Sequence, residues 1–446
     1  KDGTDGVNGK DGVNGKDGAN GVDAVGTSSV SGVSPGSAFL GRTTEVTISG
    51  FATAWDSTTT VSMGNGVTVS NVRVASPTAL LATVDVSDSA ATGPRDVTVV
   101  TGTNTLSYRG FHVGSPIAVN VQGTQAQGSL LVATIRNLDL VAHPFDTTST
   151  GGLFSPVDYP NLSVTASAGI TVQLGDVAAG SVSVVLAVDG DIATGPASLT
   201  VKSGPAGEEV SFVNTMALDV AAQTPTSLAI GATTDVPLAN AYDSKYVSIA
   251  VPQGLHVVDI ETVGSRSDPV LALLGPSQHF ADMIGSGAAI ARVGNGQTWH
   301  GVLWNNTNAS ANTASVTVNA LPATSFAEGA ANGDKASATA LTLPAVVQGA
   351  SLTDNLDSDW FAITIAAGDV GKRFAVVTYA GDPETDTNVT IYDPSDAEFA
   401  VADDRAYHET VVSDAITVDG RYYVEVNASS AGLGDDRDYD MAVYLK

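Results

Sequence analysis

Acidic side chains are the residues of this sequence whose number and grouping could do chemistry. Residues 323–446 carry 22 Asp and Glu against 7 Lys and Arg, which is more than half of the excess acid in a chain with a net charge of −28. Clustered carboxylate oxygens suit a hard cation such as Ca²⁺, which takes about six to eight oxygen ligands. A solubilising acidic surface is the alternative interpretation of the same composition.

The nucleophiles and bases of the chain show no catalytic spacing. The six histidines form neither a His-Glu-x-x-His motif nor a close pair, no Gly-x-Ser-x-Gly elbow is present, and cysteine is absent. Gly64-Asn65-Gly66 and Gly294-Asn295-Gly296 are typical of hairpin turns and not of nucleotide-binding loops. We therefore expect no enzymatic activity.

Charge and hydropathy restrict the classes of binding partner and the cellular location of the protein. An acidic surface repels nucleic acid and anionic membranes, since binding to phosphates requires cations. No apolar run reaches the roughly 18 residues needed to span a bilayer. The absence of cysteine is compatible with export. We expect a secreted or cell-surface protein, processed ahead of Lys1, with a lipid anchor on a preceding cysteine as one alternative.

The spacing of apolar residues indicates strands. Val46-Thr47-Ile48 and Val97-Thr98-Val99 alternate β-branched and polar residues, and Gly, Asn, Asp and Pro punctuate such segments along the chain. This rhythm predicts an all-β fold of tandem β-sandwich domains.

The N-terminus follows a different period. Glycine occupies every third position from Gly3 to Gly21, and only glycine fits the crowded axis of a collagen triple helix. Residues 1–25 resemble bacterial collagen-like segments, which implies a short triple-helical stem. A flexible leader is the alternative, and a triple helix would make the protein a trimer.

An internal repeat divides the next part of the chain. The segment 91–102 returns at 193–204 as Ala-Thr-Gly-Pro followed by a strand, and Gly66-Val67-Thr68-Val69 returns at 169–172. The offsets are 102 and 103 residues. We predict two equivalent domains, 26–115 and 116–220. They resemble immunoglobulin-like domains of the IPT/TIG type, which implies a fold and no particular function.

A fainter repeat covers the rest. The segment 243–254, which begins Asp-Ser-Lys-Tyr, matches 357–368, which begins Asp-Ser-Asp-Trp. We predict a third domain at 221–322 and a fourth at 323–446. The fourth resembles the bacterial pre-peptidase C-terminal domain, a jelly-roll-like sandwich, and the third resembles it in a more divergent form. These resemblances imply two jelly-roll-like sandwiches after the two immunoglobulin-like ones. The resemblance rests on Asn332-Gly333-Asp334, Asp357-Ser358-Asp359-Trp360-Phe361, Val389–Pro394, Asp403-Asp404 and Gly420–Val426.

This resemblance implies a calcium site, because some members of that family bind Ca²⁺ between an acidic segment and the Asp-x-Asp strand. Carried over by position, the ligands would be Glu328, Asn332, Asp334, Asp357 and Asp359. The alternative is an acidic turn in which the Asp side chains cap local amides. In the third domain Lys245 replaces Asp359, so we expect no ion there.

Aromatic residues on the predicted strands of the fourth domain have two interpretations. In the pairs Trp360-Phe361 and Tyr422-Tyr423 one ring faces inward and its neighbour outward. Core packing is the first interpretation, and an outer aromatic strip that binds a ligand is the second.

Together these features predict a non-enzymatic extracellular structural protein, a subunit of a bacterial fibre, filament or adhesin. It would form homo-oligomers through the collagen-like stem or through strand edges. The alternatives are a calcium-dependent module that binds a glycan or a matrix protein, and an accessory fragment of a secreted hydrolase.

Overall fold

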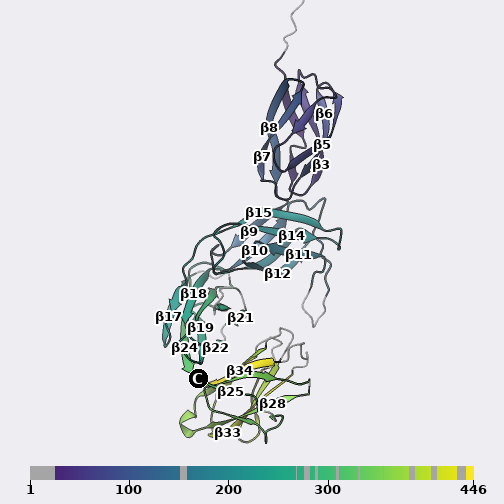
Figure 1. Ribbon diagram of the computed structural model, residues 1–446. Coiled ribbons are helices and arrows are strands. Elements are labelled where there is room, and N and C mark those ends of the chain that lie inside the picture. The colour runs from purple at the N-terminus through teal and green to yellow at the C-terminus, as the bar shows by residue number, and fades with distance from the viewer. Residues whose placement is uncertain are drawn as a thin grey trace, which may run out of the picture. The chain divides into compact units, whose positions relative to one another are not determined.

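The computed structural model describes residues 26–150, 158–267, 269–275, 282–286, 290–307, 311–329, 332–354, 356–380, 387–402, 409–428 and 438–446. Within them the only helical element is the 3₁₀ turn η1 (Ala367–Asp369), and every other regular element is a strand. The strands form eight sheets that pair into four β-sandwiches (Figure 1). The predicted all-β architecture of tandem sandwiches is confirmed. The collagen-like segment 1–25 lies outside the described residues.

The chain divides into two units, Lys1–Ser115 and Pro116–Lys446. The first unit holds one sandwich, with sheets in the orders β1-β3-β6-β5 and β2-β8-β7-β4. Its strands are β1 (Ser29–Ser34), β2 (Ser37–Phe39), β3 (Thr43–Phe51), β4 (Thr60–Ser62), β5 (Val67–Ser76), β6 (Ala79–Val86), β7 (Gly93–Thr101) and β8 (Asn104–Gly114).

The second unit begins with a sandwich whose sheets run β12-β13-β10-β9 and β11-β14-β15. Its strands are β9 (Ile117–Gln122), β10 (Ser129–Asn137), β11 (Leu162–Ala166), β12 (Ile170–Ala178), β13 (Ser181–Val188), β14 (Gly195–Ser203) and β15 (Val210–Val220).

The third sandwich has sheets β16-β18-β23-β20-β21 and β17-β24-β19-β22. Its strands are β16 (Thr226–Leu228), β17 (Ala232–Leu238), β18 (Ser244–Ala250), β19 (His256–Gly264), β20 (Val270–Gly275), β21 (Asp282–Ser286), β22 (Ile290–Gly294), β23 (Thr298–Trp304) and β24 (Asn312–Pro322).

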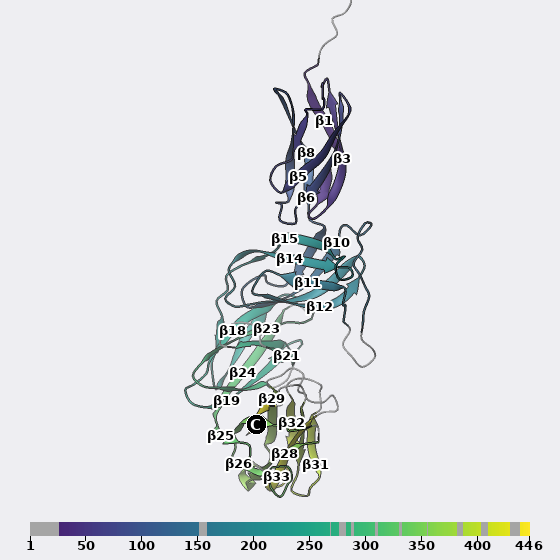
Figure 2. The same ribbon diagram turned by 45° about the vertical axis from the view of Figure 1, so that its right-hand side comes forward.

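The fourth sandwich has sheets β26-β28-β33-β30-β31 and β25-β27-β34-β29-β32. Figure 2 shows several of these strands from a second direction. They are β25 (Thr324–Ala327), β26 (Thr339–Leu341), β27 (Ala345–Ser351), β28 (Ser358–Ile365), β29 (Arg373–Ala380), β30 (Thr387–Tyr392), β31 (Glu398–Ala402), β32 (Thr410–Ala415), β33 (Gly420–Ala428) and β34 (Asp438–Leu445).

The first two sandwiches share backbone conformation as well as sequence. Gly93 and Gly195, which begin β7 and β14, have φ angles of 119° and 117°. Gly66 and Gly169, which precede β5 and β12, have φ angles of 78° and 83°. Only glycine adopts such angles without strain. The repeated glycines therefore mark the places where each sandwich needs a left-handed backbone.

The third and fourth sandwiches share a strand order. In both, the sheet that carries the repeated Asp-Ser-x-aromatic segment has β18 or β28 second and β23 or β33 at its centre. Tyr246 on β18 pairs with Val302 on β23, and Trp360 on β28 pairs with Glu425 on β33. Tyr246 and Trp360 therefore occupy equivalent outward positions, because the next residues, Val247 and Phe361, belong to the two cores.

The two Gly-Asn-Gly segments do not form the hairpins that we expected. The first joins β4 to β5, and the second joins β22 to β23. In each case the two strands belong to different sheets of one sandwich. The prediction is wrong because the turn signature specifies the local backbone but not the sheet that the next strand enters.

A hydrophobic cluster joins the second and third sandwiches. Tyr246, Val302 and Trp304 of the third pack against Leu130 and Ala187 of the second. The ring of Tyr246 lies so close to Gly128 that a Cβ added there would be 2.3 Å from its Cδ2 atom. The Thr124 hydroxyl donates a hydrogen bond of 2.8 Å to the buried Asp243 carboxylate.

A second cluster joins the third and fourth sandwiches. Val257 of the third packs with Val346, Val377 and Tyr444 of the fourth. At its margin the Tyr444 hydroxyl donates a 2.6 Å hydrogen bond to Asp259, and the Lys446 ammonium lies 3.1 Å from the same carboxylate. The second unit thus has continuous apolar packing across both of its module junctions.

Candidate functional site

The five predicted calcium ligands lie on three segments of the fourth sandwich. Glu328 follows β25, Asn332 and Asp334 lie in the loop before β26, and Asp357 and Asp359 lie at the start of β28. The loop is held against the strand, because the Trp360 backbone N–H donates to the Asn332 carbonyl at 2.8 Å.

The buried Asp359 and the half-buried Glu328 form an acidic pair. Asp359 is 1% exposed and accepts a 2.7 Å hydrogen bond from the Tyr439 hydroxyl. Burial, and next a hydrogen bond with Glu328, raises the pKa of Asp359 to about 8. Glu328 in turn accepts a 2.9 Å hydrogen bond from the Ser351 amide. Two carboxyl groups held this closely share a proton or require a cation.

The other predicted ligands are engaged elsewhere. Asp357 accepts hydrogen bonds from the Thr353 amide and hydroxyl at 2.8 and 2.7 Å, and from the Ser358 amide at 3.0 Å. Asp334 accepts from the Ser337 amide and hydroxyl, which lowers its pKa. These are the capped acidic turns of the alternative interpretation.

Asn332 is buried, and its amide nitrogen has no hydrogen-bond partner. A half-turn about χ2 would bring its carbonyl oxygen, the atom that binds a cation, to this position. The donor set thus fits a cation in part, with Glu328, Asp359 and the Asn332 amide. In the described part of the chain, no three Asp, Glu or His side chains are grouped so that they could hold a metal ion.

In the third sandwich, a lysine side chain lies at the position that is equivalent to Asp359. The Lys245 ammonium lies 3.5 Å from Asp243, the residue equivalent to Asp357. The sequence difference at this position therefore places a side-chain ammonium beside the acidic strand start.

Tyr439 is a site residue that sequence reasoning missed. It lies 80 positions after Asp359 on the last strand, in an alternating run of buried residues that also includes Met441 and Val443. Nothing in that run distinguishes a hydroxyl donor from an ordinary core aromatic.

The two aromatic pairs divide between the core and the surface. Phe361 and Tyr422 are 0% and 1% exposed, whereas Trp360 and Tyr423 are half-buried on the outer face. The Trp360 ring stacks on Tyr392 with centroids 5.3 Å apart, and the Tyr392 hydroxyl donates a 2.9 Å hydrogen bond to Glu425. Core packing is therefore confirmed for Phe361 and Tyr422, and Trp360 and Tyr423 lie on the outer face, where ligand binding stays a prediction.

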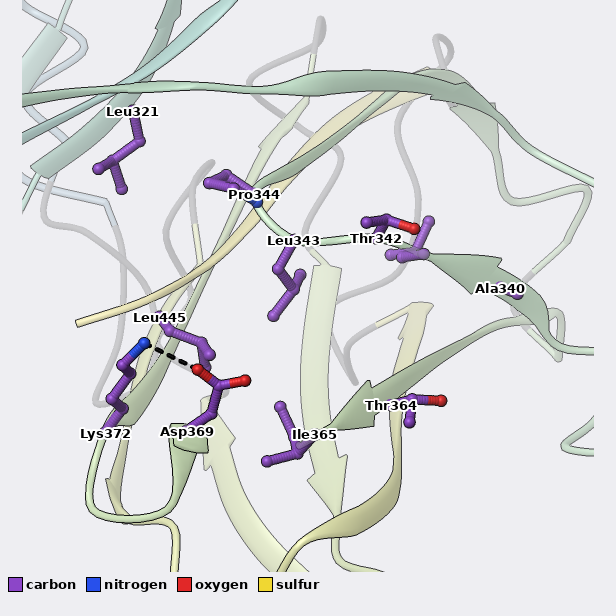
Figure 3. A pocket seen from close by; sticks show the side chains of 11 residues that line it. Leu321, Ala340, Thr342, Leu343, Pro344, Thr364, Ile365, Asp369, Lys372 and Leu445 are labelled. Carbon is purple, nitrogen blue, oxygen red and sulfur yellow. Dashed lines mark hydrogen bonds and ion pairs between the residues drawn. The ribbon is translucent and has the colours of Figure 1, made fainter. Parts of the chain in front are cut away.

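A hollow of about 590 Å³ lies beside β26 and β28. Leu321, Leu343, Ile365 and Leu445 line it, with the Lys372–Asp369 ion pair at 2.8 Å on its rim (Figure 3). Its lining is largely aliphatic, and no His, Ser or Tyr is among its described lining residues.

Comparison with known proteins gives one family match. Residues 27–108, most of the first sandwich, match the model of quinohemoprotein amine dehydrogenase, alpha subunit domain III. The match covers less than a fifth of the chain, so it concerns this domain alone. No curated protein matches the sequence.

Several solved structures match the chain at low identity. The Yersinia pseudotuberculosis adhesin InvE is 15% identical, with 48% of this chain and 68% of that chain covered and a TM-score of 0.17. Domains 4–9 of the surface layer protein SbsC are 10% identical, covering 92% and 83%, with a TM-score of 0.16. SGBP-B, from a xyloglucan utilization locus of Bacteroides uniformis, is 10% identical, covering 64% and 99%, with a TM-score of 0.14. These TM-scores are too low to support an inference about ligand or activity.

Proposed function

We propose that the protein is a non-catalytic structural component of a bacterial cell surface, either an adhesin or a subunit of a fibre or filament. The observation that supports this role is the apolar packing at both junctions of residues 116–446. Tandem domains move independently unless their interface is large and hydrophobic. Three sandwiches joined through such contacts transmit load as one body, which suits a surface appendage.

The docked sheet face of the second sandwich can be compared with the equivalent face of the first. Ala187 on β13, at the junction, corresponds through the 102-residue offset to Asp85 on β6. Val132 on β10 likewise corresponds to Glu45 on β3, since Ala133 pairs with Val184 and Val46 with Ala82. The same sheet face is therefore apolar where a module docks and charged in the first sandwich.

Calorimetry of the full chain tests the junctions. We expect residues 116–446 to unfold in one transition, and the Ala187→Asp variant to show an additional one, because a carboxylate beside Leu130 and Tyr246 opposes docking. The Asp85→Ala variant is the matched control, since Asp85 accepts only an exposed 2.7 Å hydrogen bond from Thr43 among its identified contacts. Independent unfolding of the three sandwiches in the unmodified protein would contradict the proposal.

A second candidate function is calcium-dependent binding of a glycan or protein by the fourth sandwich. The specific observation behind it is the Glu328–Asp359 pair, in which Asp359 is buried, together with the unsatisfied side-chain amide of Asn332, whose backbone carbonyl accepts from the Trp360 amide. Glu328, Asp359 and Asn332 would hold the ion, with Asp357 released from its turn. A bound Ca²⁺ would neutralise the pair and tie Glu328 and Asn332 to the start of β28.

Titration calorimetry with Ca²⁺ alone tests this candidate. We expect binding that raises the melting temperature and releases a proton at pH 7, and we expect the Asp359→Asn variant to lose both effects. The Asp334→Asn variant should retain them, because the Asp334 carboxylate is directed to Ser337. Absence of binding to the unmodified protein would reject the calcium site and leave the structural role in place.

A further inference from the structure

The outer face of β28, β33 and β30 in the fourth sandwich corresponds to a docking surface of the third. There, Tyr246 and Val302 on β18 and β23 are covered by the second sandwich. In the fourth sandwich the equivalent residues are Trp360 and Glu425, which are only half-buried. The aromatic position is thus kept in both copies, whereas the apolar Val302 of the docked copy is replaced here by the charged Glu425, as in interfaces that also exist unbound.

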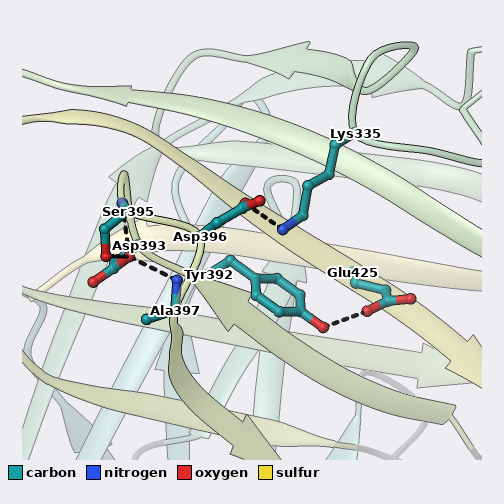
Figure 4. Close-up of polar contacts among 7 residues, drawn as sticks. All are labelled: Lys335, Tyr392, Asp393, Ser395, Asp396, Ala397 and Glu425. Carbon is teal, nitrogen blue, oxygen red and sulfur yellow. Dashed lines mark hydrogen bonds and ion pairs between the residues drawn. The ribbon is translucent and has the colours of Figure 1, made fainter.

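Three aromatic rings on this face surround a lysine ammonium. The Lys335 Nζ atom lies 3.9 Å from the centroid of Tyr392, 5.0 Å from that of Trp360 and 5.7 Å from that of Tyr423. The Asp396 carboxylate accepts a 2.5 Å hydrogen bond from the same atom (Figure 4). We call Trp360, Tyr392, Tyr423 and Asp396 the aromatic cage.

The geometry of the aromatic cage selects a cation. Ring faces are negative and attract an ammonium within about 6 Å of the centroid. Glu425 adds a carboxylate to the face by accepting the Tyr392 hydroxyl, and the surrounding sandwich is the most acidic part of the chain. The resident ammonium comes from the loop 332–338 and not from a strand of the sheet, so it can leave without disturbing the strand pairing.

We propose that the aromatic cage is a docking site for a lysine side chain presented by a partner polypeptide, and that Lys335 occupies the position of that side chain until the partner binds. The partner's chemistry follows from charge complementarity and from the cation already in place. The equivalence with the docked face of the third sandwich indicates that the partner is a protein.

The test uses the full chain and a decapeptide of alternating lysine and serine, with its Nε-acetylated form as the matched peptide. Removal of the resident ammonium in the Lys335→Met variant should tighten binding of the unmodified peptide by roughly two- to thirty-fold, which is the range of one cation–π contact. The Trp360→Ala change should weaken binding by a similar factor. Tyr423→Leu provides a second cage variant if Trp360→Ala fails to fold.

The control variant is Lys372→Met, which removes the same charge from the same sandwich at the Asp369 ion pair. It should leave the affinity within a factor of two of the unmodified protein. Equal tightening by Lys372→Met and Lys335→Met would overturn the proposal, because the effect would be general electrostatics. Equal binding of the acetylated peptide would also overturn it, as would binding of a xyloglucan oligosaccharide to the aromatic cage without binding of the lysine peptide.

Discussion

At the scale of single residues, the Glu328–Asp359 pair makes the free energy of unfolding depend on pH. Asp359 has a pKa of about 8 in the folded protein and about 3.8 in the unfolded chain. Between these values the folded state binds more protons than the unfolded state. The free energy of unfolding therefore falls as pH rises from 4 to 8.

We predict that the Asp359→Asn variant removes most of this pH dependence. The amide can accept from Tyr439 and donate to Glu328 without a proton from solvent. Urea denaturation at pH 5 and pH 8 in the presence of a chelator measures the difference, which we expect to be about 1–3 kcal/mol smaller in the variant. Asp334→Asn is the control, because its pKa is lowered and it titrates below this window. An unchanged pH slope in Asp359→Asn would show that the pair is not the cause.

A second residue-scale prediction concerns Tyr444. Burial, and next the Asp259 carboxylate, raises the pKa of the Tyr444 hydroxyl, which therefore remains a donor at neutral pH. Tyr444→Phe leaves a buried carboxylate with one donor fewer and should destabilise the protein by about 1.5–3 kcal/mol. Tyr422→Phe, which removes a hydrogen bond to the neutral Val418 carbonyl at 2.9 Å, should cost about 0.5–1.5 kcal/mol. Equal losses in denaturant titrations would argue against a special role for Asp259.

Only part of the candidate site could be predicted at this scale. The resemblance placed Glu328 and Asp359 in one site, and the structure brings them together. It also placed Asp334 there, whereas the nearby Ser337 offers that carboxylate two donors. Lys335 was not predicted as a cage residue, because its contacts with Tyr392 and Tyr423 come from strands far along the chain.

At the scale of elements, the repeated glycines lead to a matched prediction. Gly93→Ala and Gly195→Ala should each destabilise their sandwich by about 1 kcal/mol or more, because an L-residue is strained at these φ angles. A Cβ at either position meets nothing within 4 Å, so the effect is conformational and not steric. Gly32→Ala is the control, since that glycine is equally open and does not have a positive φ. Thermal denaturation that ranks Gly32→Ala with the other two would contradict this explanation.

The alternation of buried and exposed residues along strands was the feature that the sequence predicted best. Val46 and Ile48 in β3, and Val97 and Val99 in β7, are buried as their period of two predicted. The connections between strands were predicted less well, because each Gly-Asn-Gly turn joins strands of two different sheets. Turn chemistry is local, but the destination of a chain after a turn depends on which sheet face can bury its apolar side.

At the scale of the whole molecule, the Gly-X-Y segment carries the prediction about assembly. Deletion of residues 1–25 should lower the oligomeric state measured by light scattering, because a triple helix would join three chains. A variant with the same 25 residues in shuffled order, which breaks the glycine period, should behave like the deletion. An unchanged number of chains per particle in both variants would assign assembly to other surfaces.

The junctions were not predictable from composition or periodicity. Tyr246, Val302 and Trp304 have the pattern of ordinary strand residues, and burial on both faces of β18 and β23 depends on a neighbour encoded more than 50 residues earlier. The clearest sequence signal is comparative: Ala187 in one repeat replaces Asp85 in the other.

The shared strand order of the third and fourth sandwiches has a consequence for what a duplicated module can do. The same strand order supplies both an interface between modules, centred on Tyr246 and Val302, and a partly exposed face, centred on Trp360 and Glu425. A few substitutions along two neighbouring strands thus decide whether a copied module packs this face against another module or leaves it accessible to solvent.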